Sequence, residues 1–141
     1  KHEDVVKIEL HPIGVVRTES RTLPRHWSVS EVEGWLEIDS AYASGLKDIV
    51  AQERILVFFI FHQSPPFTKD FLIQKPPHRN APRGVFSTCS PVRPNPLGMS
   101  VVQVLSVDGC RIHVRGLDMR DGTPIIDIKP LSGLQVADPQ I

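Results

Sequence analysis

The chain has little that would mark a secreted, membrane-spanning or strongly basic protein. Its 16 Lys and Arg residues balance 16 Asp and Glu residues, it has 2 cysteines, and aromatic residues make up 6%. Zero net charge excludes a protein whose whole surface is basic for nucleic-acid binding, and two cysteines exclude a disulfide framework. The N-terminal residues lack the apolar core of a signal peptide, and the longest apolar run, Ile55–Phe61, is too short to cross a bilayer. We therefore expect a soluble, cytoplasmic protein without a membrane partner.

Standard catalytic motifs are also missing. The chain contains no GxSxG, P-loop, HExxH or GxGxxG sequence, so the usual signals for hydrolases, P-loop enzymes, zinc proteases and dinucleotide-binding domains are absent. The six histidines are scattered and the cysteines match no metal spacing, so we expect no metal ion. Without a nucleophile beside a base, the residues suit a site that binds a reactive cofactor and orients a second substrate.

The apolar pattern that is present is mostly that of β-strands. We expect strands at Ile8–Leu10 and Ile13–Val16 (with Pro12 at a bulge or edge), Glu31–Ile38, Arg54–Phe61, Gly84–Cys89, Met99–Val107, Cys110–Leu117 and Ile125–Ile128. A short helix is expected at Tyr42–Ile49, capped by Ser40 or Ser44. Seven or so strands with weak helical periodicity predict a mainly β single domain over residues 1–141, a sandwich or barrel with one or two short helices rather than a doubly wound sheet.

The sequence also predicts the burial of one strand, the position of a hairpin and the state of the two cysteines. Arg54–Phe61 is apolar almost throughout, which is typical of a central strand buried on both faces. Asp108-Gly109 between two strand-like runs predicts a tight hairpin. Both cysteines, Cys89 and Cys110, are expected to be reduced and buried on strands.

Residues 64–96 form a long, constrained segment that holds eight of the 13 prolines. Such a segment is too long for a simple connection, so we expect it to lie over a functional face. Its end, Arg93-Pro94-Asn95-Pro96, presents a guanidinium and a carboxamide on a rigid turn, and Gly98 is expected to adopt a backbone angle that other residues resist. Residues 64–107 carry a net charge of +4, which suits local contact with phosphates or, equally, a solvated loop.

Polar clusters follow several of the apolar strands. Phe61-His62-Gln63 ends the most buried strand, and Leu117–Pro130 contains a turn at Asp121–Pro124 with Asp127 and Lys129 alternating beyond it. An early loop, Pro24–Trp27, combines a cation, an imidazole and a large ring, which suits stacking on a base or covering a ligand.

Six sequence blocks in this order resemble one known family. They are His11–Arg17, Pro24-Arg25, Val57–Gln63, Gly84–Thr88, Arg93–Ser100 (RPNPLGMS) and Asp121–Pro130 (DGTPIIDIKP). Together they are similar to the TsaA-like (YaeB-like, TrmO) family, whose characterised members are S-adenosylmethionine-dependent tRNA N(6)-threonylcarbamoyladenosine methyltransferases. The resemblance implies a small β-barrel-like domain, unrelated to Rossmann methyltransferases, that works as a homodimer. Longer members carry a further C-terminal domain, which we do not expect in residues 1–141.

The resemblance also implies the cofactor-binding residues. By family position these are Pro24, Arg25, His26, His62, Gln63, Cys89, Val101, Asp118, Met119, Arg120, Asp121, Gly122 and Thr123. Cys89 stands where many members have an arginine, and a thiol cannot make the same charged contact. Leu131 likewise replaces a usual aromatic residue after DIKP.

The implied reaction is methyl transfer to a nitrogen of a modified adenosine in tRNA. His62 and Asp121 are the candidate catalytic residues, since a modest base can take the proton from the nitrogen. Substrate contacts are expected from Trp27, Arg93, Asn95 and Lys129. The alternatives are a methyltransferase for a small molecule, a non-catalytic S-adenosylmethionine- or nucleotide-binding module, and a domain that only dimerises.

Overall fold

The domain is built around a closed six-stranded antiparallel barrel. The computed structural model describes residues 6–77 and 79–134. The barrel strands run in the order β1-β2-β7-β6-β3-β8, and β8 pairs again with β1. Their bounds are β1 Gly14–Arg17, β2 Glu33–Ile38, β3 Arg54–Ile60, β6 Leu97–Asp108, β7 Arg111–Arg115 and β8 Pro124–Pro130. The expected mainly β fold is confirmed, and it is a barrel rather than a sandwich or a doubly wound sheet.

Alternate side chains along the barrel strands point into a shared apolar core. On β2 the alternating residues Gly34, Leu36 and Ile38 are buried, as predicted, and Ile112 and Val114 of β7 join the same core. In β3 three consecutive residues, 55–57, are buried. Ile55 and Val57 pack in the core. The opposite side of the strand is covered by η5 (Leu131–Leu134), which contacts both β3 and β8. The prediction of a strand buried on both faces is therefore confirmed over this part of β3.

Short 3-10 helices occupy the connections. They are η1 Trp27–Val29, η2 Ser40–Leu46, η3 Lys69–Phe71, η4 Val85–Ser87 and η5. The helix expected at Tyr42–Ile49 is present as η2, but it begins earlier, and its cap is Asp39, whose carboxylate accepts a hydrogen bond from the Ala41 backbone amide. The serine caps were wrong because an aspartate one residue upstream of Ser40 already supplies the acceptor.

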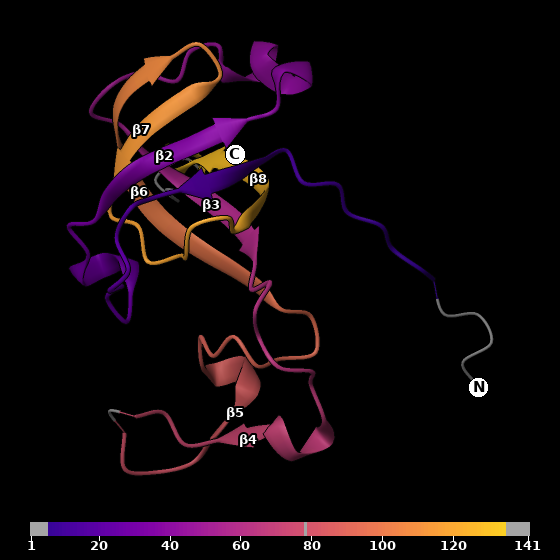
Figure 1. The fold of residues 1–141 in the computed structure, drawn as a ribbon. Helices are drawn as coiled ribbons and strands as arrows, with labels where there is room; N and C mark the ends of the chain where they lie inside the picture. Colours follow the sequence, from indigo (N-terminus) through magenta and orange to yellow (C-terminus); the bar gives the residue numbers. More distant parts are fainter. Residues whose placement is uncertain (1–5, 78, 135–141) are drawn as a thin grey trace.

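The segment between β3 and β6, residues 61–96, is here called the flap. Figure 1 shows the flap projecting from one end of the barrel, with the two-stranded sheet of β4 (Ile73–Gln74) and β5 (Arg83–Gly84) away from the barrel strands. Ile60 pairs with Leu97, so the flap leaves and re-enters the barrel at neighbouring points. The prediction that this segment lies over a functional face holds only for its two roots, which line a pocket described below.

Several local predictions were wrong. The residues before Gly14 form no strand in the described part of the chain, and Gly84–Cys89 is mainly the helical turn η4 rather than a strand. Cys89 is exposed, and Cys110 is half-buried in the β6–β7 hairpin turn instead of on a strand. The hairpin itself is confirmed, because Gly109 adopts a φ of 62° and Asp108 pairs with Arg111. In the described residues, no helix is long and apolar enough to span a membrane.

Candidate ligand-binding pocket

One pocket lies at the end of the barrel from which the flap projects. It has a volume of about 360 Å³. Its walls come from the end of β3, the two roots of the flap, the loop after β1 and the turn after β7. The lining residues are Leu23, Phe59, Ile60, Phe61, His62, Gln63, Ser64, Pro65, Pro91, Asp118, Met119, Arg120 and Thr123. Six residues predicted for the cofactor site therefore meet here: His62, Gln63, Asp118, Met119, Arg120 and Thr123.

Asp118 is the only acidic residue in the lining of this pocket. Its Oδ1 accepts a hydrogen bond of 2.5 Å from the Ser100 hydroxyl, and Ser100 is fully buried on β6. Burial raises the pKa of the Asp118 carboxyl, while the Ser100 hydrogen bond, the nearby charge of His26 and backbone amides act in the opposite direction. The pocket thus contains a desolvated carboxylate whose orientation is fixed by a buried donor.

The backbone on both sides of Asp118 is anchored. The Ser30 hydroxyl donates to the Leu117 carbonyl at 2.5 Å, and the Leu117 side chain is fully buried in the core. On the other side, the Thr123 hydroxyl donates to the Arg120 carbonyl at 2.6 Å, and Gly122 takes a φ of 84° to complete the turn. Because the chain is held before and after it, the backbone of Asp118 has a fixed place at this end of the barrel.

The opposite wall is aromatic. Phe59 and Phe61 meet edge to face with ring centroids 5.1 Å apart, an arrangement that aromatic pairs favour. Gly98 on β6 lies directly against them, since a Cβ at this position would approach ring atoms of Phe59 to 2.4 Å. Gly98 does not have a positive φ, so the predicted reason for this glycine was wrong: it provides space for the rings, not an unusual backbone angle.

The rim of the pocket is polar. Arg120 Nη1 donates to Gln63 Oε1 at 2.5 Å, which joins the turn after β7 to the root of the flap. His62 beside it is exposed and lines the same pocket. Two predicted residues on separate motifs, Gln63 and Arg120, are thus in direct contact, and His62 is placed to meet a ligand that enters from solvent.

The early loop approaches Asp118 from behind the pocket. His26 Nδ1 accepts a hydrogen bond from the Ser28 amide and lies 2.7 Å from the Ser28 hydroxyl, so the imidazole caps η1. Its ring lies against Trp27, with centroids 4.8 Å apart. Neither ring lines the pocket, but His26 is close enough to Asp118 to affect its pKa. Pro24 and Arg25 precede these residues and are also outside the lining.

Asp121 lies on the other side of the same turn. Its carboxylate accepts a hydrogen bond of 3.1 Å from the Thr18 amide and lies 3.8 Å from the Arg17 guanidinium. These residues line a second hollow of about 540 Å³ on the outside of β1, β2 and β7. The structure therefore does not bring Asp121 together with His62, the other predicted catalytic residue.

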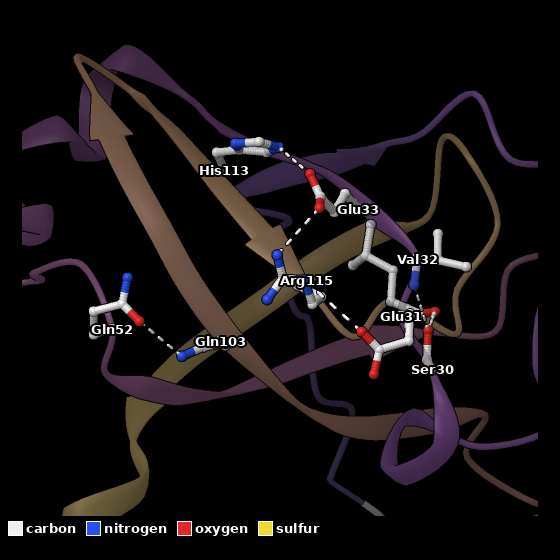
Figure 2. Close-up of polar contacts among 9 residues, drawn as sticks. Ser30, Glu31, Val32, Glu33, Gln52, Gln103, His113 and Arg115 are labelled. Atoms are coloured by element: carbon white, nitrogen blue, oxygen red, sulfur yellow. Dashed lines mark hydrogen bonds and ion pairs between the residues drawn. The ribbon is translucent and has the colours of Figure 1, made fainter.

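The outer face around this second hollow is a network of paired charges. Figure 2 shows Glu33 between His113 and Arg115, with Glu31 on the far side of Arg115. Trp35 stacks on His113 with centroids 4.6 Å apart, and the Arg111 guanidinium lies 4.1 Å from the Trp35 ring centroid. Because these groups already satisfy one another, the face needs no ligand.

The remaining predicted residues lie away from the pocket. Arg93 Nη1 donates to the carbonyls of Thr88 and Ser90 at 3.1 and 3.0 Å, so its guanidinium closes its own loop on both sides of Cys89. Lys129 lies 3.5 Å from Asp127 on β8, which confirms that these two residues share a face. Asn95 is exposed on the flap and Val101 is buried beside Ser100. No group of three metal-binding side chains occurs among the residues that the structure describes.

The sequence did not predict the roles that Ser100 and Gly98 have at this site. The signal for Ser100 was a hydroxyl beside the apolar residues Val101 and Val102, because a buried polar side chain needs a partner. For Gly98, the signal was missed because the strand was predicted to begin at Met99, whereas β6 begins at Leu97; a glycine on a strand often marks the close approach of another group.

A closed antiparallel barrel with an aromatic pocket and a partly buried carboxylate at one end defines a small ligand-binding barrel, distinct from Rossmann domains. Residues 15–134 match the family described as the tRNA-methyltransferase O N-terminal domain. The chain belongs to this family, as its sequence motifs indicated.

Individual relatives agree with this assignment. An S-adenosyl-L-methionine-binding protein of Archaeoglobus fulgidus is 40% identical over 126 residues, which cover 87% of this chain and 88% of that protein. The mouse tRNA (adenine(37)-N6)-methyltransferase is 40% identical over 77 residues, 55% of this chain and 18% of that protein. The crystal structure of TrmO from Pseudomonas aeruginosa matches with a TM-score of 0.74 and 28% identity, covering 96% of this chain and 61% of the other. The chain thus spans only part of the length of several relatives, including 34% of a second Archaeoglobus fulgidus protein.

Proposed function

We propose that this domain binds S-adenosylmethionine in the pocket at the flap end and directs methyl transfer to a nitrogen of threonylcarbamoyladenosine at position 37 of tRNA. The observation that carries the proposal is the desolvated Asp118 carboxylate facing an aromatic wall. Relatives described as S-adenosyl-L-methionine-binding proteins and as tRNA methyltransferases support it. A tRNA substrate would place the protein in the cytoplasm.

The residues of the pocket suit this cofactor. Phe61 offers aromatic surface to a flat purine ring, with the buried Phe59 packed edge to face behind it. The Asp118 carboxylate attracts a cationic group or accepts hydrogen bonds from hydroxyls. When bound, S-adenosylmethionine supplies an electrophilic methyl group on a positively charged sulfur. The domain itself contributes position and charge: Asp118 balances positive charge, while the Arg120–Gln63 pair fixes the rim around the reacting groups.

His62 is our candidate for the base that accepts the proton from the substrate nitrogen. It is exposed at the rim of the pocket, whereas Asp121 faces the second hollow. Of the two predicted catalytic residues, His62 is therefore better placed to act as the base. His26 and Trp27 approach Asp118 from behind, and Asn95 is exposed on the flap, so they remain proposed ligand contacts. Arg93 and Lys129 already have partners within the chain, which weakens their proposed role in substrate binding.

The test has two readouts. Calorimetry with S-adenosylmethionine measures binding, and mass spectrometry of nucleosides measures methyl transfer from an isotopically labelled cofactor to tRNA. We expect label on threonylcarbamoyladenosine and none on tRNA that lacks this modification. Binding without label on any nucleoside would contradict the proposed reaction. Single-turnover methylation by His62→Ala at the wild-type rate would remove His62 from the role of base.

A second candidate is a binding module without catalytic activity. The specific observation in its favour is that the Archaeoglobus fulgidus relative, which the chain matches over 88% of its length, is described only as an S-adenosyl-L-methionine-binding protein. This candidate predicts tight cofactor binding in the calorimeter and no turnover on tRNA or on free nucleosides.

A homodimer is a further part of the proposal. Exposed apolar side chains gather on the flap and on the adjoining start of β6, which is the type of surface that a second copy covers. They are Leu72 (40% exposed), Ile73 (63%), Phe86 (76%), Leu97 (44%) and Met99 (43%). Light scattering after gel filtration should give twice the monomer mass, and Ile73→Ser/Phe86→Ser should give the monomer. A wild-type monomer at all concentrations would contradict the dimer.

A further inference from the structure

The tip of the flap carries a group of basic residues, and Asp70 in η3 is the one acidic residue of the flap. Lys75, Arg79 and Arg83 lie on or between β4 and β5, and all three are exposed. The sequence contains no aspartate or glutamate from Phe71 to Val107. Among the ion pairs of residues 6–77 and 79–134, none involves a flap residue. These cations therefore keep their full attraction for an external anion.

The arginines of the barrel face differ in this respect. Arg17, Arg111 and Arg115 each have a carboxylate oxygen within 4.0 Å. A carboxylate beside each of these cations offsets its charge, so the pair adds little net positive potential to the barrel face. The protein is neutral overall, so its positive potential is concentrated on the flap and not on the barrel.

The basic tip stands on an ordered platform. Gln74 of β4 pairs with Arg83 of β5, and Lys75 follows directly after β4. The Gln74 amide donates to the carbonyls of Phe71 and Val92 at 2.7 and 2.8 Å, and this joins the sheet to the returning arm of the flap. Arg83 and the residue before Lys75 thus belong to a hydrogen-bonded sheet, and Arg79 lies in the loop that joins its two strands.

The flap also stands beside the pocket. Ser64, Pro65 and Pro91 at its roots line the pocket, and the Ser64 hydroxyl donates to the Pro91 carbonyl at 2.9 Å, which holds the two roots together. Figure 1 shows the flap continuing outward from this end of the barrel. A nucleic acid that presents one nucleoside at the mouth of this pocket can therefore place neighbouring phosphates against the flap.

We propose that Lys75, Arg79 and Arg83 at the flap tip bind the phosphate backbone of the RNA whose target nucleoside meets the cofactor at the mouth of the pocket. The proposal rests on the proposed function, since it assigns the docking surface for the same tRNA. A polyanion fits this surface better than a folded protein does, because three separated cations match a repeating phosphate charge and require no shaped partner.

The experiment measures tRNA affinity as a function of salt concentration. The probe is naturally modified bulk tRNA, and the variant is Lys75→Gln/Arg79→Gln/Arg83→Gln. Each lost phosphate contact lowers the slope of log affinity against log salt by about 0.7 to 0.9, so we expect the slope to fall by about 2 and the affinity by at least tenfold at roughly 0.1 M salt. The matched control, Arg111→Gln/Arg115→Gln, removes two paired arginines from the barrel face and should leave both values unchanged. S-adenosylmethionine affinity and the thermal melting temperature should be the same in all three proteins.

The contrary outcomes are distinct. If the triple variant binds tRNA with the wild-type slope, the flap proposal is wrong and the proposed function stands. If the control variant loses as much affinity as the triple variant, the docking surface lies elsewhere or is diffuse. If the triple variant loses affinity only together with a change in oligomeric state, measured by light scattering, the cations act on assembly and not on RNA. If wild-type protein binds S-adenosylmethionine but no tRNA at low salt, the tRNA assignment fails, and the flap proposal fails with it.

Discussion

Asp118 and Asp121 belong to one turn, yet they face two different regions of the molecule. Asp118 faces the pocket, where burial raises its pKa and the buried Ser100 hydroxyl fixes its orientation. Asp121 faces the outer hollow, where it is exposed and has the Thr18 amide and Arg17 as partners. The two carboxylates of the motif DMRDGTP, which starts at Asp118, therefore have different roles. The desolvated carboxylate is poised to meet a ligand, while the solvated one closes the turn against β1.

The largest difference between the two aspartates should appear in cofactor binding. Asp118→Asn keeps the shape but removes the charge, and we expect the affinity for S-adenosylmethionine to fall by about 30-fold or more, since losing one member of a buried charge pair costs about 2 kcal/mol or more. Asp121→Asn should change the affinity by less than about twofold, because its charge lies in solvent outside the pocket. Isothermal calorimetry of both variants measures the contrast. Equal losses in the two would show that the turn moves as a unit and that the two regions are not separate.

A steric change confined to the pocket provides a second test. In Gly98→Ala the new Cβ would overlap the Phe59 ring, so the ring must move toward the pocket. We expect the unfolding free energy to fall by about 1 to 3 kcal/mol and cofactor affinity to fall by about tenfold. Urea unfolding and calorimetry measure the two effects. Gly45→Ala is the matched control, because nothing lies within 4 Å of its added Cβ; unchanged binding in Gly98→Ala would place the cofactor elsewhere.

A third test replaces Ser100 and measures how cofactor affinity depends on pH. In Ser100→Ala the carboxylate loses a hydrogen bond that favours its ionised form, so the pKa of Asp118 should rise further above its ordinary value of 3.8. A cationic ligand needs the ionised carboxylate, and the loss of affinity on acidification should therefore begin at a higher pH than in the wild type. His26, His62 and Arg120 are the other ionisable groups near this region. Asp118→Asn serves as the control, since any pH dependence that remains in this variant does not come from the Asp118 carboxyl.

Ser100→Ala should also change how the free energy of unfolding depends on pH. A carboxyl whose pKa is raised by folding binds more protons in the native state, so the unfolding free energy falls as pH increases from the unfolded pKa to the folded pKa. Ser100→Ala should extend that interval upward, and Asp118→Asn should abolish it. If Ser100→Ala and the wild type have parallel pH profiles, the hydroxyl supports folding but does not tune the carboxylate.

The smallest effect is expected on the outer side of the turn. Asp121→Asn weakens an exposed ion pair with Arg17 and a backbone contact to Thr18. Exposed pairs contribute about 0 to 1 kcal/mol, so the unfolding free energy should fall by less than about 1 kcal/mol, and added salt should reduce the difference. Thermal unfolding at low and high salt checks this. A larger, salt-independent loss would mean that the Asp121–Thr18 hydrogen bond, rather than charge, holds the turn against β1.

Much of the barrel could be predicted from the sequence because its signals are local. The apolar run of β3, the alternation in β2 and the Asp108-Gly109 turn each fix an element within a few residues. The flap could not be predicted in this way, because its shape depends on hydrogen bonds between distant residues, such as Gln74 with Val92. Gly84–Cys89 has the composition of a strand but has only a two-residue partner in β4, so most of it folds into η4 instead.

The site was predictable as a set of segments but not as a set of contacts. The sequence motifs brought His62, Gln63 and Asp118 to attention, and all three line the pocket. They did not indicate which aspartate of the turn faces inward, because that depends on the anchoring of Leu117 by Ser30 and of Thr18 by Asp121. They likewise gave Arg93 a role toward substrate, whereas its guanidinium is taken up by carbonyls around Cys89.

The pairing of Ile60 with Leu97 makes the flap an insertion at the tip of an ordinary β-hairpin. Since the two ends are already adjacent, replacing about 36 residues by a four-residue turn would lower the loop-closure cost by about 2 kcal/mol in the simplest polymer treatment. The closed barrel would have no new sheet edge exposed by such a deletion. Folding is thus encoded in the barrel, while the length and charge of the flap can vary independently. One scaffold can in this way acquire new partners without remaking its core.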